Sequence, residues 1–291
     1  MPALPTAPPD PSRPAPRARV GGPRPPAAPG GRHALLTGLE HRLRLTPQRP
    51  LLVHRTPGPL TFAVVSIAWL RSLGAPARDH LAETRLHPDE LARLRGFALP
   101  KRRTEWLAGR LAVKHAVTAQ LLGGGPGAPD AGAGGPDPRD IVVHAVPEGP
   151  RAGKPYVREP VHIGLSHSLD FAIAVSGAQP LGIDLEGRPV GPHLARLLDV
   201  PATGRAPAGL RRVAAMPLPL RWACREAVVK CTGVAGPGAL HQTRITDWRP
   251  DGTFHWTPGA ALLRHAPGAD ALPAHGWARQ LGTYALAVTW R

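Results

Sequence analysis

Proline and glycine decide which parts of this chain can fold. There are 38 prolines and 33 glycines among 291 residues, and both residue types interrupt helices and strands. Eleven of the prolines, five arginines and the single acid Asp10 fall in residues 1–32, which predicts a solvated, polyproline-like tail. Seven glycines and four prolines in residues 123–139 predict an exposed loop. The fold therefore has to form from the stretches between and after these segments.

Composition outside these segments fits one large or two smaller globular units, since 42% of all residues are hydrophobic. A net charge of +16 favours acidic partners, whether nucleic acid, a phosphorylated cofactor or an acidic protein. The longest apolar run, residues 61–70, has about half of the ~20 residues that span a bilayer, and the first residues have no apolar signal-peptide core. The two cysteines, Cys224 and Cys231, cannot build a disulfide framework. We therefore expect a cytoplasmic protein without a membrane segment.

Hydrophobic periodicity predicts a mixed α+β fold, with helices dominating the first half. Residues 101–122 have helical spacing, a second helix starts near residue 88, and residues 60–70 fit either a strand or a buried helix. Four short runs rich in Ile and Val predict strands at residues 141–146, 162–165, 171–176 and 181–185. A helix, a hairpin and a last strand are expected at residues 218–232, around 250–252 and at 283–289.

Two acids are separated by one residue in Gly182-Ile183-Asp184-Leu185-Glu186. On a strand this spacing puts both carboxylates on one face, while Ile183 and Leu185 point into the core. Such a pair can hold Mg²⁺, which prefers one or two carboxylates together with waters and substrate phosphates. Two solvated acids on an open strand face give the same pattern, so the pair by itself leaves both interpretations open.

A third acid lies on the helix predicted near the C-terminal third of the chain. Trp222, Glu226 and Lys230 are spaced to share one helical face. They are either a solvated Glu–Lys pair worth ~0.3–0.5 kcal/mol or a third metal carboxylate with a neighbouring lysine. Residues 106–114 align without gaps on residues 222–230, which hints at internal symmetry.

A serine and a histidine follow each other in the strand-ending segment at residues 163–168. Adjacent strand residues point to opposite faces, so Ser166 and His167 are poorly placed as nucleophile and base. We therefore expect this hydroxyl and this imidazole to bind a phosphate group and not to act as nucleophile and base. Gly153-Lys154-Pro155 is typical of an ordinary turn with a lysine.

In their order and spacing these segments resemble the 4′-phosphopantetheinyl transferases of the surfactin type. The segments that carry the resemblance are Gly109-Arg110…Lys114, Gly153-Lys154-Pro155, Leu165-Ser166-His167-Ser168, Gly182-Ile183-Asp184-Leu185-Glu186 and Trp222…Arg225-Glu226-Ala227…Lys230…Gly233. The resemblance covers residues 88–233, with looser support from the strand expected at residues 283–289.

The resemblance implies a monomer of two similar α/β lobes with pseudo-twofold symmetry. Here these would be an N-terminal lobe over residues 33–158 and a C-terminal lobe over residues 159–291 that carries the metal site. Enzymes of this family transfer the 4′-phosphopantetheine group of coenzyme A to a serine of an acyl or peptidyl carrier protein, often in secondary metabolism. They depend on Mg²⁺ and release adenosine 3′,5′-bisphosphate. Their carrier proteins are acidic, which suits a basic enzyme.

Motif matching also implies roles for individual residues. The implied metal ligands are Asp184, Glu186 and Glu226. The implied catalytic residues are Glu226, Lys230 and His167, with Lys230 on the pyrophosphate and Glu226 as a hypothetical acceptor of the serine proton. The implied contacts to coenzyme A are Arg103, Arg110, Lys114, Lys154, Pro155, Ser166, His167 and Lys230.

The chain departs from the family pattern in three places, of which the first is Arg225, where the family usually has lysine. Residues 187–221 contain no aromatic residue, where the family usually has a Phe-x-x-x-Glu element, and Glu105 stands where members often carry an arginine that Arg102 or Arg103 would replace. Two alternatives stay open. One is an inactive relative that binds coenzyme A without turnover. The other is a basic nucleic-acid-binding protein, which the charge favours and the scarcity of aromatic residues disfavours.

Overall fold

Two sheets and the helices on their outer faces make up the folded unit, Gly31–Arg291. The structure, a computed structural model, describes residues 36, 38–123, 135–187, 189, 191, 195, 196, 198, 206–234, 237–265, 272, 273 and 275–291. The predicted tail at residues 1–32 and most of the glycine-rich segment at residues 123–139 lie outside the described residues.

Helices and strands occur in groups along the described chain, which confirms the predicted mixture of α and β structure. The helices are α1 (Leu39–Arg42), α2 (Ile67–Ser72), α3 (Ala75–Arg85), α4 (Pro88–Arg95), α5 (Pro100–Leu121), α7 (Ala208–Ala215), α8 (Leu218–Thr232), α9 (Pro237–His241) and α10 (Ala260–His265). The strands are β1 (Leu51–Arg55), β2 (Leu60–Ser66), β3 (His144–Ala145), β4 (Pro155–Tyr156), β5 (His162–Ser168), β6 (Phe171–Gly177), β7 (Leu181–Glu186), β8 (Thr243–Trp248), β9 (Phe254–Pro258), β10 (His275–Leu281) and β11 (Tyr284–Trp290).

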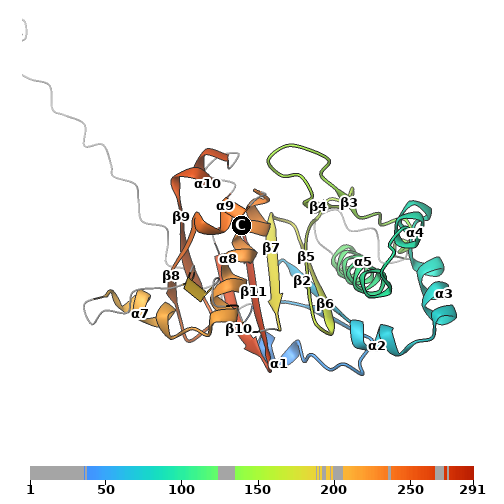
Figure 1. The fold of residues 1–291 in the computed structure, drawn as a ribbon, viewed down its shortest axis with the longest axis horizontal. Helices are drawn as coiled ribbons and strands as arrows, with labels where there is room; N and C mark the ends of the chain where they lie inside the picture. Colours follow the sequence, from blue (N-terminus) through green and yellow to red (C-terminus); the bar gives the residue numbers. More distant parts are fainter. Residues whose placement is uncertain are drawn as a thin grey trace, which may run out of the picture. The chain divides into compact units, whose positions relative to one another are not determined.

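Antiparallel pairing gives a four-stranded sheet in the order β1-β2-β6-β5 and a three-stranded sheet in the order β10-β11-β7 (Figure 1). Two hairpins, β3–β4 and β8–β9, stand beside them. Serine hydroxyls of β5 join the two sheets. The hydroxyl of Ser166 accepts the backbone N–H of Leu185 at 3.2 Å, and that of Ser168 accepts the backbone N–H of Gly187 at 2.9 Å. Strand β7 is thereby fixed beside β5.

Strand β7 shows the period of two that places its acids. Its residues Leu181, Ile183 and Leu185 belong to the apolar layer between the two sheets. Its other residues face helix α8, since a Cβ added to Gly182 would meet the α8 backbone at Ala227 and Cys231. The two acids of β7 therefore share the face that was predicted from the sequence, and the leucines and isoleucine are in the core as expected.

One long helix covers the outer face of each sheet, and small side chains make this contact close. Helix α5 packs on the four-stranded sheet over Ala63, Ala172 and Ala174. Helix α8 packs on the three-stranded sheet over Ala285 and Ala287. The order of layers is therefore α5, first sheet, second sheet and α8 (Figure 1).

Most expected elements are confirmed, and one is shorter than expected. Residues 60–70 form a strand followed by a helix, and α5, α8 and the β8–β9 hairpin lie where they were expected. The predicted strand at residues 141–146 shrinks to His144–Ala145. Its first part bonds to side chains instead of a neighbouring strand. The backbone N–H of Val143 donates to Glu90 at 3.1 Å, and the carbonyl of Ile141 accepts the Lys114 ammonium at 2.5 Å.

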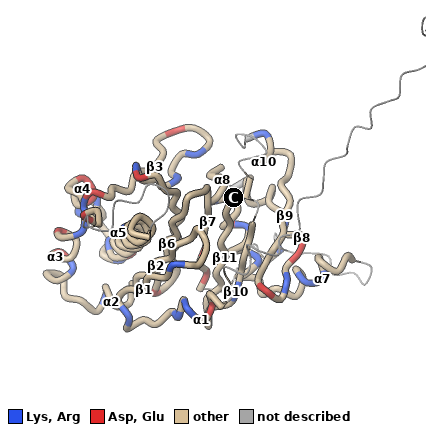
Figure 2. The backbone as a smooth tube through the Cα atoms, turned by 180° about the vertical axis from the view of Figure 1, so that it is seen from behind, with Lys and Arg blue, Asp and Glu red and all other residues tan. Residues whose placement is uncertain are grey.

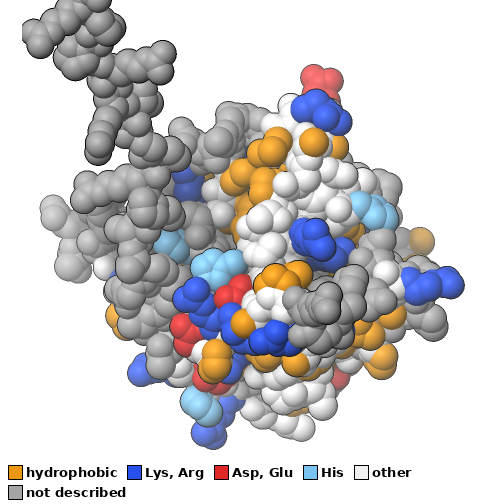
Figure 3. All heavy atoms as spheres, turned by 90° about the vertical axis from the view of Figure 1, so that its left-hand side faces the viewer, with side chains coloured by type: hydrophobic (Ala, Val, Ile, Leu, Met, Phe, Trp, Pro, Cys, Tyr) orange, Lys and Arg blue, Asp and Glu red, His pale blue; other side chains and the backbone are white. Residues whose placement is uncertain are grey.

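Basic residues are distributed over several elements of the described chain (Figure 2). On the face that carries α7, β8 and β9, acidic groups lie among the basic ones (Figure 3). There Asp247 pairs with Arg212 at 2.7 Å and with Arg249 at 3.4 Å. Part of the positive charge is thus compensated locally. No helix among the described residues is both long enough and apolar enough to cross a membrane.

Candidate functional site

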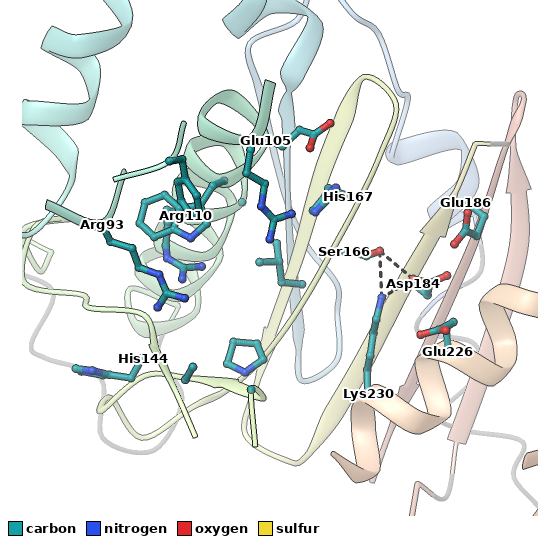
Figure 4. A pocket seen from close by; sticks show the side chains of 18 of the residues that line it. Arg93, Glu105, Arg110, His144, Ser166, His167, Asp184, Glu186, Glu226 and Lys230 are labelled. Atoms are coloured by element: carbon teal, nitrogen blue, oxygen red, sulfur yellow. Dashed lines mark hydrogen bonds and ion pairs between the residues drawn. The ribbon is translucent and has the colours of Figure 1, made fainter. Parts of the chain in front are cut away.

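A cavity of about 600 Å³ lies between α5 and α8 and contains most of the residues singled out from the sequence (Figure 4). Helices α4 and α5 form one wall, α8 and β7 the opposite wall, and hairpin β3–β4 and strand β5 the rest. Its lining residues are Arg93, Phe97, Arg102, Glu105, Trp106, Gly109, Arg110, His144, Ala145, Gly153, Pro155, Leu165, Ser166, His167, Asp184, Glu186, Trp222, Glu226 and Lys230.

The α8–β7 wall is acidic, with a single lysine among the acids. Asp184 and Glu186 come from β7, while Glu226 and Lys230 come from α8. The Lys230 ammonium lies 2.5 Å from Asp184 Oδ1 and 3.3 Å from Ser166 Oγ. The Ser166 hydroxyl donates to the same Asp184 oxygen at 2.9 Å. Figure 4 shows these side chains directed toward one another.

Mutual repulsion and burial disturb the titration of this wall. Burial and the neighbouring Asp184 raise the pKa of Glu186 to about 7, although Lys230 opposes the shift. Burial also raises the pKa of Glu226, again with Lys230 acting in the opposite direction. Carboxyl groups with raised pKa values are frequent at functional sites, because catalytic acids and bases need pKa values that match their task.

The raised pKa of Glu186 predicts a pH-dependent stability. Between about pH 4.5 and 7 the folded chain keeps a proton that the unfolded chain has lost, so the free energy of unfolding falls as pH rises through this window. Glu186→Gln cannot titrate there. Denaturant titrations in EDTA at several pH values should show the wild type losing stability relative to Glu186→Gln from pH 4.5 to above 7. A difference that stays constant over this window contradicts the assignment.

Apart from Glu105, the charged and aromatic residues of the α4–α5 wall are arginines, Phe97 and Trp106. The guanidinium of Arg110 stacks on the Trp106 ring at 4.2 Å from its centroid, and Phe97 contacts the same ring with 5.8 Å between centroids. Arg93 and Arg110 lie opposite the carboxylates (Figure 4). A ligand in this cavity would therefore meet cations and aromatic rings on one side and acids on the other, which suits a phosphorylated molecule with a ring system.

The acidic wall has the chemistry of a site for a hard cation. Asp184 is 2% exposed, and its Oδ2 is buried without a hydrogen-bond partner among the described residues. Carboxylate oxygens are the ligands that Mg²⁺ prefers, so Asp184, Glu186 and Glu226 fit it in donor type. Among the described residues, however, no three His, Cys, Asp or Glu side chains already lie close enough together to hold a metal ion.

Eight of the residues named from the sequence line the cavity and three do not. The eight are Arg110, Pro155, Ser166, His167, Asp184, Glu186, Glu226 and Lys230. Arg103 points elsewhere and donates to the carbonyl of Phe97 at 2.6 Å, whereas its neighbour Arg102 lines the cavity. Lys114 and Lys154 are occupied by other contacts.

Lys114 is buried below the cavity and serves the fold. It is 1% exposed, pairs with Glu90 at 2.8 Å and donates to the carbonyls of Pro138 and Ile141. Lys154 donates to the carbonyl of Cys231 at 2.6 Å, at the end of α8. Neither lysine is therefore among the proposed contacts to the nucleotide.

Three lining residues had no signal in the sequence. Arg93, Phe97 and His144 lie on α4, on the segment after it and on β3. Glu90, on the same helix as Arg93, pairs with the buried Lys114 of α5. The need of a buried lysine for an acidic partner is the one feature of the sequence that could have pointed to this helix. The contribution of α4 to the site thus became visible only in the tertiary structure.

Comparison with known proteins gives little that bears on this site. No protein-family model matches the chain, and no curated protein matches it. The solved structures similar to it include a holo-(acyl-carrier-protein) synthase from Bacillus anthracis str. Ames in complex with CoA (3′,5′-ADP). The two share 24% identity over 40% of this chain and 92% of that chain, with a TM-score of 0.31. A likeness this low assigns neither fold nor function to the chain.

Proposed function

We propose that this protein transfers the 4′-phosphopantetheine group from coenzyme A to a serine of an acyl or peptidyl carrier protein in a Mg²⁺-dependent reaction. The observation that carries the proposal is the convergence of distant motifs on one cavity. Residues of Gly109-Arg110, Ser166-His167, Asp184-x-Glu186 and Trp222…Glu226…Lys230 all line it. These are the segments on which the sequence resembles the surfactin-type transferases.

The proposed reaction is a displacement at phosphorus. The serine Oγ forms a bond to the phosphorus that carries pantetheine, and the bond from that phosphorus to the bridging oxygen of adenosine 3′,5′-bisphosphate breaks. The serine proton leaves to an acceptor, and the bridging oxygen takes the negative charge. Such a reaction needs mainly positioning and neutralisation of charge on oxygen.

The cavity supplies groups for each of these tasks. Glu226 is the proposed acceptor of the serine proton, directly or through a water, because it is a carboxylate on the cavity wall. Lys230 and Arg110, which line opposite walls of the cavity, are the proposed contacts to phosphate oxygens. Mg²⁺, when held by Asp184, Glu186 and Glu226, would neutralise part of the pyrophosphate charge. Ser166 and His167 are the proposed contacts to the nucleotide.

We also propose that the protein is a monomer of two related lobes. Each sheet with its long helix would be one lobe, and the aligned segments support this because Trp106 of α5 and Trp222 of α8 both line the cavity. The lobe boundary expected from the sequence, between residues 158 and 159, would assign β5 and β6 to the second lobe. In the structure these two strands belong to the first sheet, together with β1 and β2. A boundary after β6 would keep each sheet within one lobe.

A mass-spectrometric transfer assay tests the function. The purified chain, coenzyme A and Mg²⁺ are mixed with a panel of apo-carrier proteins, and the carriers should gain the mass of one phosphopantetheine. Glu226→Gln should lower the transfer rate by at least about 100-fold. The control Glu83→Gln, which removes an exposed charge paired with Arg95 at 2.9 Å, should leave the rate unchanged.

The outcomes separate the remaining alternatives. Binding of coenzyme A in calorimetry without modification of any carrier identifies an inactive relative. Transfer by Glu226→Gln at the wild-type rate contradicts the role of Glu226. Absence of coenzyme A binding at every Mg²⁺ concentration overturns the proposed function as a whole.

A further inference from the structure

We propose that Lys154 is a latch that fastens hairpin β3–β4 to the C-terminal end of α8 and so positions Lys230 and one wall of the cavity. This role differs from a direct contact with coenzyme A. The inference rests on the proposed function only where its test uses coenzyme A as a ligand.

The latch begins at the last turn of α8. The Lys154 ammonium donates to the carbonyl of Cys231 at 2.6 Å, one residue after Lys230. The last carbonyls of a helix have no partner within the helix and carry partial negative charge. A lysine that bonds one of them stabilises the end of the helix and restricts the turn that carries Lys230.

The stem of Lys154 lies directly on the residue that ends the helix. Gly233 has φ 72° and its backbone N–H donates to the carbonyl of Val229 at 2.8 Å. A Cβ added to Gly233 would lie 2.7 Å from Cδ of Lys154. Glycine is therefore required here twice, for the left-handed backbone and for the space that the lysine stem fills.

The other end of the latch is a wall of the cavity. Gly153 and Pro155, on either side of Lys154, line the cavity, as do His144 and Ala145 from the paired strand. Lys154 itself lines a second cavity of about 560 Å³. Its side chain reaches α8 from the hairpin, so the hydrogen bond couples the position of the hairpin to the last turn of α8.

The surroundings of the ammonium support a fixed contact. Burial and the nearby Arg151 lower the pKa of Lys154 to about 8, while the Cys231 thiol opposes the shift. Burial, and then the charges of Lys154 and Arg151, lower the pKa of the His162 imidazole. The Lys154 ammonium is buried near the Arg151 cation, so it depends on the Cys231 carbonyl as its hydrogen-bond acceptor.

Hydrogen exchange tests the latch without any substrate. In Lys154→Met the amides at the end of α8, residues 229–233, should exchange at least about tenfold faster than in the wild type, because a hydrogen bond to a charged group is lost. Arg158→Met is the matched control, since it removes an exposed cation from the same segment. Lys154→Arg keeps a cationic donor and should recover most of the protection.

Two ligands that differ by one phosphate distinguish a latch from a direct contact. Calorimetry with coenzyme A and with dephospho-coenzyme A should show both ligands weakened by the same factor, about tenfold, in Lys154→Met, with most of the affinity regained in Lys154→Arg. A loss confined to coenzyme A would mean that Lys154 binds the 3′-phosphate, and it would overturn the latch.

The exchange result can overturn the proposal without any ligand. Unchanged exchange at the end of α8 in Lys154→Met overturns the latch, even if coenzyme A binds more weakly. If the wild type binds neither ligand, the proposed function fails, and faster exchange in Lys154→Met with protection in Lys154→Arg still supports the latch. If Lys154→Met does not fold, Lys154→Arg provides the test. Slow exchange of amides 229–233 in Lys154→Arg supports the latch, and exchange of these amides as fast as that of the α9 amides overturns it.

Discussion

Gly182→Ala is expected to destroy the site and to lower the free energy of unfolding by about 3 kcal/mol, with a melting temperature roughly 6–12 °C lower. Gly182 is the first residue of the Gly-Ile-Asp-Leu-Glu segment, and a Cβ on it would overlap the carbonyl oxygen of Ala227 and the backbone nitrogen of Cys231. Both atoms belong to the backbone of α8, so no rotation of a side chain can relieve the overlap.

The functional loss should exceed what the stability change alone would cause. Helix α8 carries Glu226 and Lys230, and β7 carries Asp184 and Glu186. If α8 moves away from β7, the acidic wall opens, so binding of coenzyme A and carrier modification should both disappear at temperatures where the variant is still folded. Circular dichroism, calorimetry and the transfer assay measure the three quantities.

Gly238→Ala is the matched control for this substitution. Gly238 lies on α9, where an added Cβ meets nothing within 4 Å, so stability should stay constant or rise slightly. If Gly182→Ala behaves like Gly238→Ala, the close approach of α8 to β7 is not required for the fold or for the site.

Glu90→Gln is expected to lower the free energy of unfolding by about 3–5 kcal/mol, because it removes the counter-ion of a buried lysine. Glu90 is 4% exposed and Lys114 is 1% exposed, and their charged groups lie 2.8 Å apart. Burial lowers the pKa of Lys114, and Glu90 is the group that opposes this shift most. Without Glu90 the ammonium keeps its hydrogen bonds to two backbone carbonyls and a weaker interaction with the charge of Glu159.

The site should also suffer in Glu90→Gln. Arg110 Nε lies 3.6 Å from Glu90, is buried and has no hydrogen-bond partner among the described residues. Removing the carboxylate frees this guanidinium from its place beside Trp106, so the affinity for coenzyme A should fall even at low temperature. Chemical denaturation and calorimetry measure the two effects.

Two further variants test whether the loss of stability in Glu90→Gln comes from leaving a charge buried without its partner. Glu83→Gln breaks an ion pair whose side chains are 53% and 69% exposed, and it should change stability by less than about 1 kcal/mol. The double variant Glu90→Leu, Lys114→Met removes both charges and should be more stable than Glu90→Gln. A double variant less stable than the single one contradicts the account of Glu90 as a counter-ion.

Sequence reasoning succeeded where local spacing decides the outcome. The period of two in β7 placed Ile183 and Leu185 inside and both acids on one face, because successive side chains of a strand must point to opposite sides. The long helices were found for a similar reason, since apolar side chains recur at helical spacing in α5 and α8.

Spacing in the sequence did not predict the contacts of side chains that can reach several different partners. Arg102 and Arg103 are neighbours on α5, and only the packing of that helix decides that Arg102 lines the cavity. The lysines of the Gly-Arg and Gly-Lys-Pro segments were expected at the nucleotide, yet Lys114 pairs with Glu90, and Lys154 bonds to the end of α8.

Local spacing was enough to predict the class of the fold, the main helices and strands, and the orientation of the acids on β7, since these depend on residues within a few positions of one another. The partners of the charged side chains followed only from the packing of distant segments. Glu90 lies 24 positions from Lys114, and Lys154 lies 77 positions from Cys231. The free energy of a buried charged side chain depends on its burial and on its partner in the folded protein. Neither can be predicted from the spacing of neighbouring residues.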